Sequence, residues 1–398
     1  MRLSRFLRIL SCFILLSTLC FALSAAAAPH TGAAAIDTNR FAVLPAGERV
    51  LVAPPATSAA SYALFDPVGG DFLAEKDGDT RRPMASTTKI MTGLLALELL
   101  SPDEEITIPP AAVGVEGSSI YLFVGERISV RTLLYALLLS SANDAATALA
   151  IHAAGSVEAF AAKMNEKALA LGLTNTHFCN PHGLSVPEHY TTARDLARLT
   201  AAALEHPTFA EIVATKRYSA PQIGTDAGRL FLNHNRLLRT LDGAVGVKTG
   251  FTKASGRCLV SAAKRDGLLL IAVTLNDPND WRDHTALLDW GFSVRTAFSP
   301  VLNPLTLPVV GGTTGTVALL PQSTPTLTLP SDHAAITCTI EAPRFLFAGF
   351  TEGEIKGRAV YRMGDDVLCE IPLVTGEAVP LQKAPLSWPE RIKNLFRK

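Results

Sequence analysis

Strand-like segments flank a long helical block, and this order constrains the fold more than any other feature of the chain. Two short strand-like runs, at residues 61–65 and 72–75, surround a Pro-Val-Gly-Gly turn. Further strand-like runs follow the helical block, at residues 247–251, 257–263 and 268–274. This order predicts an α+β domain whose antiparallel sheet joins both ends of the segment, with a helical insertion between them.

The block between the strands is rich in Ala and Leu, and its apolar residues recur three and four positions apart, a period that predicts helices. We expect helices at residues 85–100, 130–154, 157–171, 192–205 and 284–290. The first begins close to Ser86, because Pro83 precedes it and proline is favoured where the first helical amides lack partners. Together these segments predict one domain over residues 58–298.

The first 28 residues have the pattern of an export signal. Three arginines precede an apolar run at residues 9–23, and small residues follow at 24–28. The pattern predicts a cleaved signal peptide and an exported protein, with an uncleaved membrane anchor as the alternative. Residues 29–57 are rich in Ala, Pro and Thr and lack a sustained period, so we expect an N-terminal arm there.

After Pro300 the composition changes to Pro, Thr, Val and Gly with short alternating runs. These runs predict a small all-β domain over residues 299–385. In the last segment, 386–398, Ile392, Leu395 and Phe396 recur at helical spacing among basic residues. Two interpretations stay open for this tail: a helix that makes peripheral contact with a membrane surface, and a solvated tail.

Charge and composition exclude several classes of protein. The 36 basic and 36 acidic residues balance, so nothing in the net charge indicates binding to nucleic acid. With 48% hydrophobic residues the chain can bury sizeable cores, which excludes disorder over most of its length.

Four cysteines remain after the signal, namely Cys179, Cys258, Cys338 and Cys369. Three pairings are open to them outside the cytoplasm. If a disulfide forms, we favour Cys338 with Cys369, because both lie in the C-terminal segment. His177, Cys179 and His182 are close in sequence but lack a regular ligand spacing, so we expect no metal site there.

Ser86 and Lys89 form the most informative motif, Ser-Thr-Thr-Lys. On a helix, residues three apart share a face, so the Lys89 amine would lie within reach of the Ser86 hydroxyl and act as its base. The helix start also leaves the Ser86 N–H available to stabilise an oxyanion. A second match, Ser261 with Lys264, lies in a predicted strand, where the two side chains point to opposite faces.

Two later tripeptides carry suitable groups in the same order along the chain. Ser141 and Asn143, in the helical block, offer a hydroxyl and a carboxamide. Lys248, Thr249 and Gly250, on a predicted strand, offer a cation, a hydroxyl and a position without a side chain, beside which a substrate backbone can lie. The order S-x-x-K, S-x-N, K-T-G is close to the motif set of penicillin-binding proteins and class A β-lactamases.

With these motifs the chain resembles the low-molecular-mass penicillin-binding proteins of the serine-type D-alanyl-D-alanine carboxypeptidase family. The likeness extends through the segments 83–92, 140–146, 180–184, 233–238 and 246–252. The resemblance implies a β-lactamase/transpeptidase-like domain followed by a small all-β domain. It also implies an exported bacterial hydrolase of the cell wall, involved in peptidoglycan biosynthesis and cell shape, which uses no cofactor and no metal.

The same resemblance implies roles for the motif residues. Ser86 would be the acylated nucleophile, and Lys89, neutral at the moment of attack, would take its proton. A neutral lysine requires burial and a second cation nearby, for which Lys248 is the candidate. Ser141 would relay a proton toward the leaving amine, and Asn143 would hold the peptide amide of the substrate.

The third motif would bind the end of the substrate. Lys248 and Thr249 would grip the terminal carboxylate, which limits cleavage to the last residue, and Gly250 would let the substrate backbone approach. The backbone N–H groups of Ser86 and Phe251 would form the oxyanion hole.

The sequence departs from the family pattern at two positions. His234 stands where the family is often basic, and Arg282 lies near the place of a family arginine but not in clear register. Contacts to the carboxylate beyond the K-T-G residues therefore stay open. We expect His182 and Asp195 to be a loop side chain and a helix-start acid, because the base is already supplied.

The expected function is removal of the terminal D-alanine from peptidoglycan stem pentapeptides through an acyl-enzyme, with β-lactams as covalent inhibitors. The alternatives are a class A-like β-lactamase, a D,D-endopeptidase of peptidoglycan cross-links, and a wall-binding protein with an inactive site. A class A enzyme carries its deacylating Glu in an E-x-x-L-N element. The nearest match begins at Glu166, lacks the Asn and lies in a predicted helix, so inhibition is favoured over hydrolysis.

Overall fold

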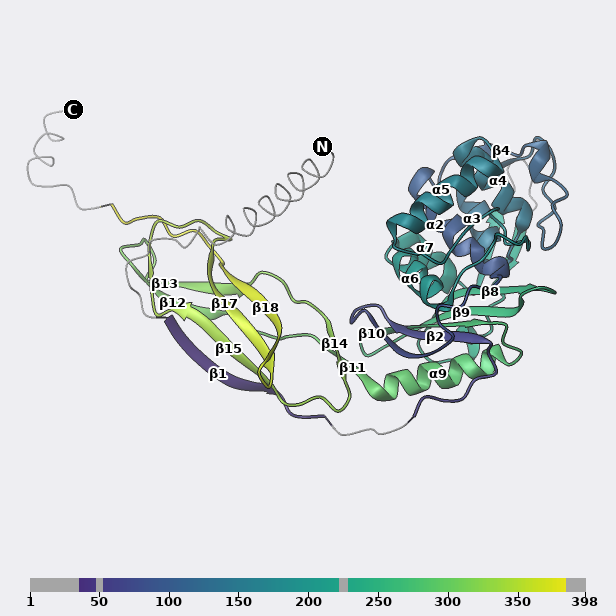
Figure 1. Ribbon diagram of the computed structural model, residues 1–398. Helices are drawn as coiled ribbons and strands as arrows, with labels where there is room; N and C mark the ends of the chain where they lie inside the picture. The colour runs from purple at the N-terminus through teal and green to yellow at the C-terminus, as the bar shows by residue number, and fades with distance from the viewer. Residues whose placement is uncertain (1–35, 48–52, 222–227, 384–398) are drawn as a thin grey trace, which may run out of the picture. The chain divides into compact units, whose positions relative to one another are not determined.

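The computed structural model of the chain describes residues 36–47, 53–221 and 228–383 (Figure 1). The chain divides into two compact units. One, called here the α+β unit, consists of the described residues within Ala46–Pro300 and Pro325–Ala334; the other, the β unit, consists of those within Met1–Pro45, Val301–Thr324 and Ala335–Lys398. The predicted signal peptide, 1–28, and the predicted basic tail, 386–398, lie outside the described residues.

A five-stranded antiparallel sheet forms the centre of the α+β unit, with the strand order β3-β2-β10-β9-β8. Its strands are β2 (Ser61–Asp66), β3 (Asp71–Lys76), β8 (Ala244–Thr252), β9 (Gly256–Arg265) and β10 (Leu268–Leu275). The first hairpin thus pairs with strands from the far end of the unit. This confirms the predicted α+β fold, in which one sheet joins both ends of the segment.

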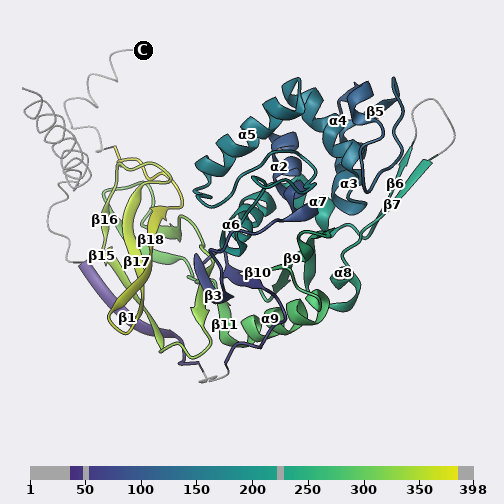
Figure 2. The same ribbon diagram turned by 45° about the vertical axis from the view of Figure 1, so that its right-hand side comes forward.

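Helices cover both faces of this sheet (Figure 1, Figure 2). Those of the insertion lie over one face and are α2 (Lys89–Leu99), α3 (Val130–Leu139), α4 (Asn143–Ala154), α5 (Val157–Ala170), α6 (Ala193–Leu204) and α7 (Pro207–Ala214). The short α8 (Leu237–Thr240) precedes β8, and α9 (Asp280–Val294) covers the other face. The 3₁₀ turns η1 (Ala85–Thr88) and η2 (Pro110–Ala112) complete the set.

Three short strand pairs lie outside the central sheet, and sequence patterns did not predict them. They are β4 (Glu105–Thr107) with β5 (Arg127–Ser129), β6 (Arg217–Pro221) with β7 (Gly228–Leu232), and β11 (Arg295–Phe298) with β14 (Leu327–Pro330). Strands of three to five residues give too few positions for an alternating pattern to be recognised.

The central sheet is buried on both sides, which explains the apolar character of its strands. On β2, Ala63 and Phe65 belong to the core beneath the helical insertion, whereas Tyr62 and Leu64 pack in the core beneath α9. Successive side chains of a strand point to opposite faces, so one strand supplies both cores. The sheet is therefore held between two helical layers, and the turn that carries Ser86 lies at its β8 edge.

One predicted helix is wrong as a single element. Residues 130–154 form two helices, α3 and α4, which are separated at Ser140, Ser141 and Ala142. Ser141 has a φ of +61°, in the left-handed region that interrupts a right-handed helix. The Ala and Leu content continues through the break, which is why the apolar period alone did not locate it.

The β unit contains a seven-stranded sheet with the order β1-β15-β17-β18-β13-β12-β16. Its strands are β1 (Ile36–Leu44), β12 (Leu305–Val310), β13 (Thr316–Pro321), β15 (Ile336–Pro343), β16 (Leu346–Phe347), β17 (Ile355–Met363) and β18 (Asp366–Thr375). Two details differ from the expected boundaries. The segment expected as an N-terminal arm contributes β1, which pairs with β15, and residues 325–334 return to the α+β unit.

The favoured disulfide between Cys338 and Cys369 is wrong, because all four described cysteines are free. Cys338 on β15 and Cys369 on β18 each pair with Tyr361 on the intervening strand β17. Neighbouring strands lie about 4.8 Å apart, so the two Cα atoms are separated by roughly 10 Å, whereas a disulfide needs less than about 7 Å. Adjacency in sequence did not reveal that a strand lies between them.

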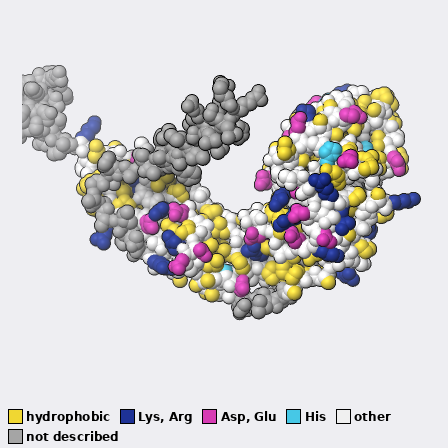
Figure 3. All heavy atoms as spheres, in the orientation of Figure 1, with side chains coloured by type: hydrophobic (Ala, Val, Ile, Leu, Met, Phe, Trp, Pro, Cys, Tyr) yellow, Lys and Arg dark blue, Asp and Glu magenta, His cyan; other side chains and the backbone are white. Residues whose placement is uncertain are grey.

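Charged side chains of both signs are interspersed on the face of the α+β unit drawn in Figure 3. This distribution agrees with the balanced charge of the sequence. No single helix of the described residues is long and apolar enough to cross a membrane; α4 and α5 reach that length and composition only as a pair bent by 83°.

Candidate active site

Ser86 lies on η1, the tight turn that leads into α2, and Lys89 is the first residue of α2. The Lys89 Nζ donates a hydrogen bond to Ser86 Oγ at 3.0 Å, as the three-residue spacing predicts. The competing match is excluded by the structure, since Ser261 and Lys264 lie on strand β9, with Ser261 buried and Lys264 exposed.

Lys89 is fully buried, and its side chain has three acceptors. Besides Ser86 Oγ, its Nζ donates to Asn143 Oδ1 at 2.6 Å and to the His182 carbonyl oxygen at 2.7 Å. Burial lowers the pKa of Lys89 well below its usual value, and the Lys248 charge lowers it further, while Asp144 acts in the opposite direction. Both conditions expected for a neutral lysine are therefore present.

The segment from Asn180 to Leu184 presents the carbonyl group of His182 to Lys89. Asn180 Oδ1 accepts from the N–H groups of His182 and Gly183, and its Nδ2 donates to the Leu184 carbonyl. Gly183 has a φ of +87°, and a Cβ there would lie 1.9 Å from the Ala85 carbonyl oxygen. The sequence marked this segment as family-like but assigned it no role.

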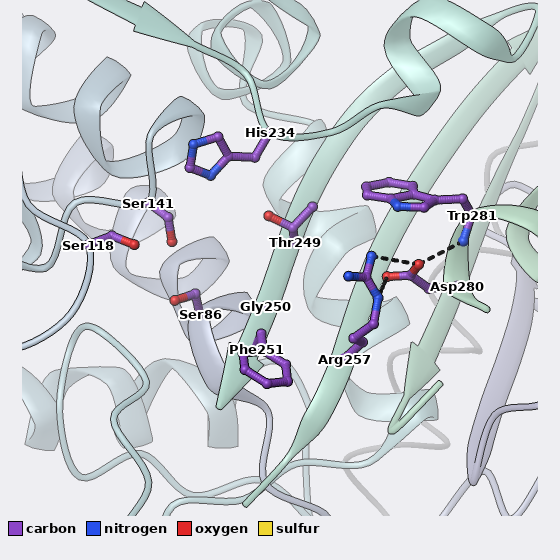
Figure 4. A pocket seen from close by; sticks show the side chains of 10 residues that line it. All are labelled: Ser86, Ser118, Ser141, His234, Thr249, Gly250, Phe251, Arg257, Asp280 and Trp281. Atoms are coloured by element: carbon purple, nitrogen blue, oxygen red, sulfur yellow. Dashed lines mark hydrogen bonds and ion pairs between the residues drawn. The ribbon is translucent and has the colours of Figure 1, made fainter. Parts of the chain in front are cut away.

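Ser141 and Asn143 stand at the break between α3 and α4. Ser141 is buried and lines a cavity of about 350 Å³ together with Ser86 and Ser118 (Figure 4). Asn143 was expected to hold the substrate amide, but both ends of its carboxamide are occupied. Its Oδ1 accepts from Lys89, and its Nδ2 donates to the Glu116 carbonyl at 2.5 Å.

Asp144 fixes the segment that carries Ser118, and sequence patterns gave no sign of this role. Its carboxylate accepts hydrogen bonds from Ser119 Oγ and from the backbone N–H groups of Ile120 and Leu122. A buried carboxylate with several donors is a rigid anchor. The cavity wall at Ser118 is therefore tied to the first turn of α4.

Strand β8 supplies the opposite wall of the cavity, with Thr249, Gly250 and Phe251. A Cβ on Gly250 would lie 3.1 Å from the backbone nitrogen of Ser86, so glycine leaves the space in front of that N–H open. Lys248 is buried and does not line the cavity; its Nζ donates to the Thr249 carbonyl. Burial lowers the pKa of Lys248 to about 7.

His234 closes one end of the cavity (Figure 4). Its backbone N–H donates to the Leu139 carbonyl, which links it to the end of α3. Burial, followed by the Lys248 charge, lowers the pKa of His234. The imidazole therefore supplies a neutral polar group where the family is often basic.

The other end of the cavity is formed by Arg257 on β9 and by Asp280 and Trp281 of α9, none of which the sequence singled out (Figure 4). Arg257 makes a bidentate ion pair with Asp280. Arg282, which lies near the place of a family arginine, instead pairs with Asp283 and lines neighbouring grooves.

The residues that could indicate other mechanisms lie elsewhere or are occupied. Glu166 is exposed on α5 and is not among the described residues that line the cavity. Asp195 lies in the first turn of α6, as expected. Its carboxylate accepts hydrogen bonds from the Asn175 N–H and the Thr176 hydroxyl of the preceding loop. Burial lowers the pKa of His182 to about 3, with Lys89 and His189 lowering it further, so His182 is an uncharged loop side chain at neutral pH.

Comparisons with known proteins agree with this site. Residues 48–279 match the peptidase S11 family, described as D-alanyl-D-alanine carboxypeptidase. The D-alanyl-D-alanine carboxypeptidase of Streptomyces sp. strain K15 is 38% identical over 261 residues, which are 61% of this chain and 89% of the relative. The carboxypeptidase DacC of Escherichia coli strain K12 is 31% identical over 350 residues, 82% of this chain and 86% of the relative.

A solved structure gives the same result for the fold. The crystal structure of penicillin-binding protein 5 from Haemophilus influenzae aligns with a TM-score of 0.63 and 28% identity, covering 83% of this chain and 99% of the other. With the serine, the lysine and the cavity in place, the chain belongs to the D-alanyl-D-alanine carboxypeptidase family of serine peptidases.

Proposed function

We propose that this enzyme removes the terminal D-alanine of peptidoglycan stem peptides through an acyl-enzyme on Ser86, with Lys89 as the base. The observation that carries the proposal is the set of acceptors around Lys89 Nζ. A neutral amine has two N–H donors and one lone pair. Asn143 Oδ1 and the His182 carbonyl accept the two donors. In the neutral amine the 3.0 Å contact with Ser86 therefore reverses its direction, and the Ser86 hydroxyl donates to the lone pair of Nζ.

Acylation follows from this arrangement. Ser86 Oγ attacks the carbonyl carbon of the penultimate D-alanine while Lys89 takes the hydroxyl proton. The negative charge develops on the carbonyl oxygen, for which the N–H groups of Ser86 and Phe251 are the proposed donors. Ser141, on the cavity wall, relays the proton to the departing amine, the C–N bond breaks, and D-alanine leaves. Water then hydrolyses the ester and restores Ser86.

β-Lactams acylate the same serine in this proposal. Their amide is strained and bears a carboxylate, so they meet the same nucleophile and the same cavity. Among the described residues that line the cavity, Asp280 is the sole acid, and it is paired with Arg257. The penicilloyl ester therefore persists, which favours inhibition over drug turnover.

The place of action is also a proposal. The pattern of residues 1–28 supports export, and peptidoglycan, whose stem peptides are the proposed substrate, lies outside the cytoplasm. The basic segment 386–398 supports peripheral contact with the membrane surface, because basic and apolar residues alternate at helical spacing.

The test combines intact mass with product release. The mature protein is incubated with excess benzylpenicillin and its mass is followed over time, while D-alanine release is measured from a diacyl-D-Ala-D-Ala peptide. A stable adduct with D-alanine release supports the carboxypeptidase. Rapid adduct loss with drug turnover would indicate a β-lactamase, and neither adduct nor release would indicate a binding protein.

Two variants locate the chemistry. Ser86→Ala is expected to abolish both adduct and release without a change in the unfolding transition. Ser261→Ala, which alters the competing Ser-x-x-Lys match on β9, is the matched control and is expected to keep both. Release from a cross-linked dimer at a rate equal to that from the pentapeptide would favour the endopeptidase alternative.

A further inference from the structure

Arg257 shares a face of the sheet with the residues that line the cavity. In the register of β8 and β9, Arg257 lies directly opposite Phe251. Opposed residues of an antiparallel pair share a face, and residues two apart on a strand do so as well. Thr249, Phe251 and Arg257 therefore project from the same side of the sheet, as Figure 4 shows for Thr249 and Arg257.

Asp280 holds the guanidinium group of Arg257 in one orientation. Nε donates to Asp280 Oδ2 at 3.1 Å, and Nη2 donates to Oδ1 at 2.8 Å. Asp280 is buried and also accepts from the Trp281 N–H, so it is itself fixed. The Trp281 ring centre lies 5.7 Å from the guanidinium carbon. A fork fixed in this way loses little conformational entropy when it binds a ligand.

The ion pair with Asp280 leaves one side of the Arg257 guanidinium group available to a ligand. Asp280 uses Nε and Nη2, and no bond to Nη1 is formed within the described part of the chain. In Figure 4 the third nitrogen points toward Thr249 and the serines, while Asp280 lies on the opposite side of the guanidinium. A substrate carboxylate at Thr249 would therefore meet N–H donors and not the carboxylate of Asp280.

Arg257 is also the cation that the cavity offers. Among the described residues lining it, Arg257 is the one lysine or arginine. Lys248, expected to bind the carboxylate, is buried beneath the wall and donates to the Thr249 carbonyl. A guanidinium group keeps its charge throughout the physiological range.

We propose that Arg257, oriented by Asp280, binds the free C-terminal carboxylate of the substrate beside Thr249 and thereby determines specificity. The inference rests on the proposed carboxypeptidase function and adds a residue to it from a strand that carries none of the three motifs. A charge-assisted hydrogen bond to the carboxylate is lost when the substrate ends in a neutral amide. Arg257 thus explains preference for a peptide with a free end.

The test compares two substrates and two inhibitors. The peptides are diacyl-D-Ala-D-Ala and the same peptide with a C-terminal carboxamide; the inhibitors are benzylpenicillin and its methyl ester. Arg257→Ala is expected to reduce kcat/KM for the carboxylate peptide, and the acylation rate with benzylpenicillin, by roughly 10- to 100-fold. The rates with the amide and the ester are expected to change by less than about 3-fold. Arg257→Lys is expected to restore part of the preference.

The chain offers a matched control on the same two elements. Arg265, also on β9, pairs with Asp289, also on α9, at 2.8 Å. Arg265→Ala removes an equivalent ion pair away from the cavity and is expected to leave the preference unchanged. Because Arg257→Ala leaves the buried Asp280 carboxylate without its partner, the double variant Arg257→Ala/Asp280→Asn is measured too, and it is expected to show the same loss of preference.

Equal losses with charged and neutral compounds would overturn the inference, because a merely structural role affects both alike. Full retention of the preference in Arg257→Ala would overturn it as well. These results are distinct from failure of the proposed function. In that case the unaltered enzyme and Arg265→Ala would themselves neither release D-alanine nor form the penicillin adduct.

Discussion

Asn143 Oδ1 accepts a hydrogen bond from Lys89 Nζ at 2.6 Å, while Asn143 Nδ2 donates to the Glu116 carbonyl. The carboxamide thus orients the proposed base and ties it to the cavity wall. In this arrangement Asn143 acts on Lys89 first, and its expected contact with the substrate amide would require one of these bonds to open.

Asn143→Asp tests this relationship. The substitution places a negative charge within hydrogen-bond distance of Lys89, which is expected to raise the pKa of Lys89. The rate of acylation by benzylpenicillin, measured across pH, should then reach its plateau at a higher pH. Asn143→Ala removes the same bond without adding charge, so it should slow acylation without that displacement. Identical profiles for the two variants would contradict the electrostatic explanation.

Lys248 is expected to act on Lys89 through its charge. Burial and Lys248 together lower the pKa of Lys89, and below about pH 7 Lys248 is itself protonated. Lys248→Met removes that charge, so the pKa of Lys89 should rise and the acidic limb of the acylation profile should move to higher pH. Lys264→Met, an exposed lysine on the neighbouring strand β9, is the control and should leave the limb in place. If the acidic limb moved to lower pH in Lys248→Met, the Lys248 charge would not be lowering the pKa of Lys89.

Gly183 is expected to be indispensable for a steric reason. A Cβ at this position would lie 1.9 Å from the Ala85 carbonyl oxygen, next to the nucleophile. Gly183→Ala should therefore displace the Ser86 turn and reduce the acylation rate by about 100-fold or more. Gly172 has a comparable φ of +70° but nothing within 4 Å of an added Cβ.

Gly172→Ala is accordingly the matched control for backbone strain. It should cost about 1 to 2 kcal/mol of unfolding free energy and leave acylation unchanged. Thermal unfolding and acylation rates are measured for both variants. Equal effects of the two substitutions on acylation would refute the steric explanation.

The sequence predicted the central sheet and the Ser86–Lys89 pair because both are encoded locally. The strand runs of β2 and β8–β10 are short apolar segments next to turn residues, and the Ser-x-x-Lys spacing fixes one face of a helix turn. Motif order added Ser141 and the β8 residues. These features depend on short-range periodicity, which a single sequence displays directly.

The remaining site residues depend on contacts between distant segments. Arg257 reaches the cavity only because β9 pairs with β8, and it is fixed by Asp280 from α9. The His182 carbonyl reaches Lys89 because Gly183 can approach Ala85. The break at Ser141 is set by its positive φ, which an Ala-rich and Leu-rich sequence does not predict. None of these features has a period or spacing along the chain.

His189 packs against the turn that carries Ser86, and its protonation is expected to make the stability of the fold depend on pH. Its Nδ1 accepts from the Cys179 N–H, and its Nε2 lies 2.7 Å from Thr88 Oγ1, which donates to the Ala85 carbonyl. Both ring nitrogens are satisfied in the neutral form, whereas a proton on Nδ1 would face another N–H. Burial lowers the pKa of His189 to about 4, and burial likewise lowers that of His284 to about 3.

Stability should therefore fall in mild acid. Between about pH 6.5, where unfolded histidine titrates, and about 4, the unfolded chain binds a proton at His189 that the folded chain does not. The contribution is complete above that range and is lost as pH decreases, by about 1.4 kcal/mol per pH unit for each such histidine. Denaturant unfolding across pH should show the slope, and His189→Gln should reduce it by about one proton. An unchanged slope in this variant would mean that His189 is protonated in the folded enzyme.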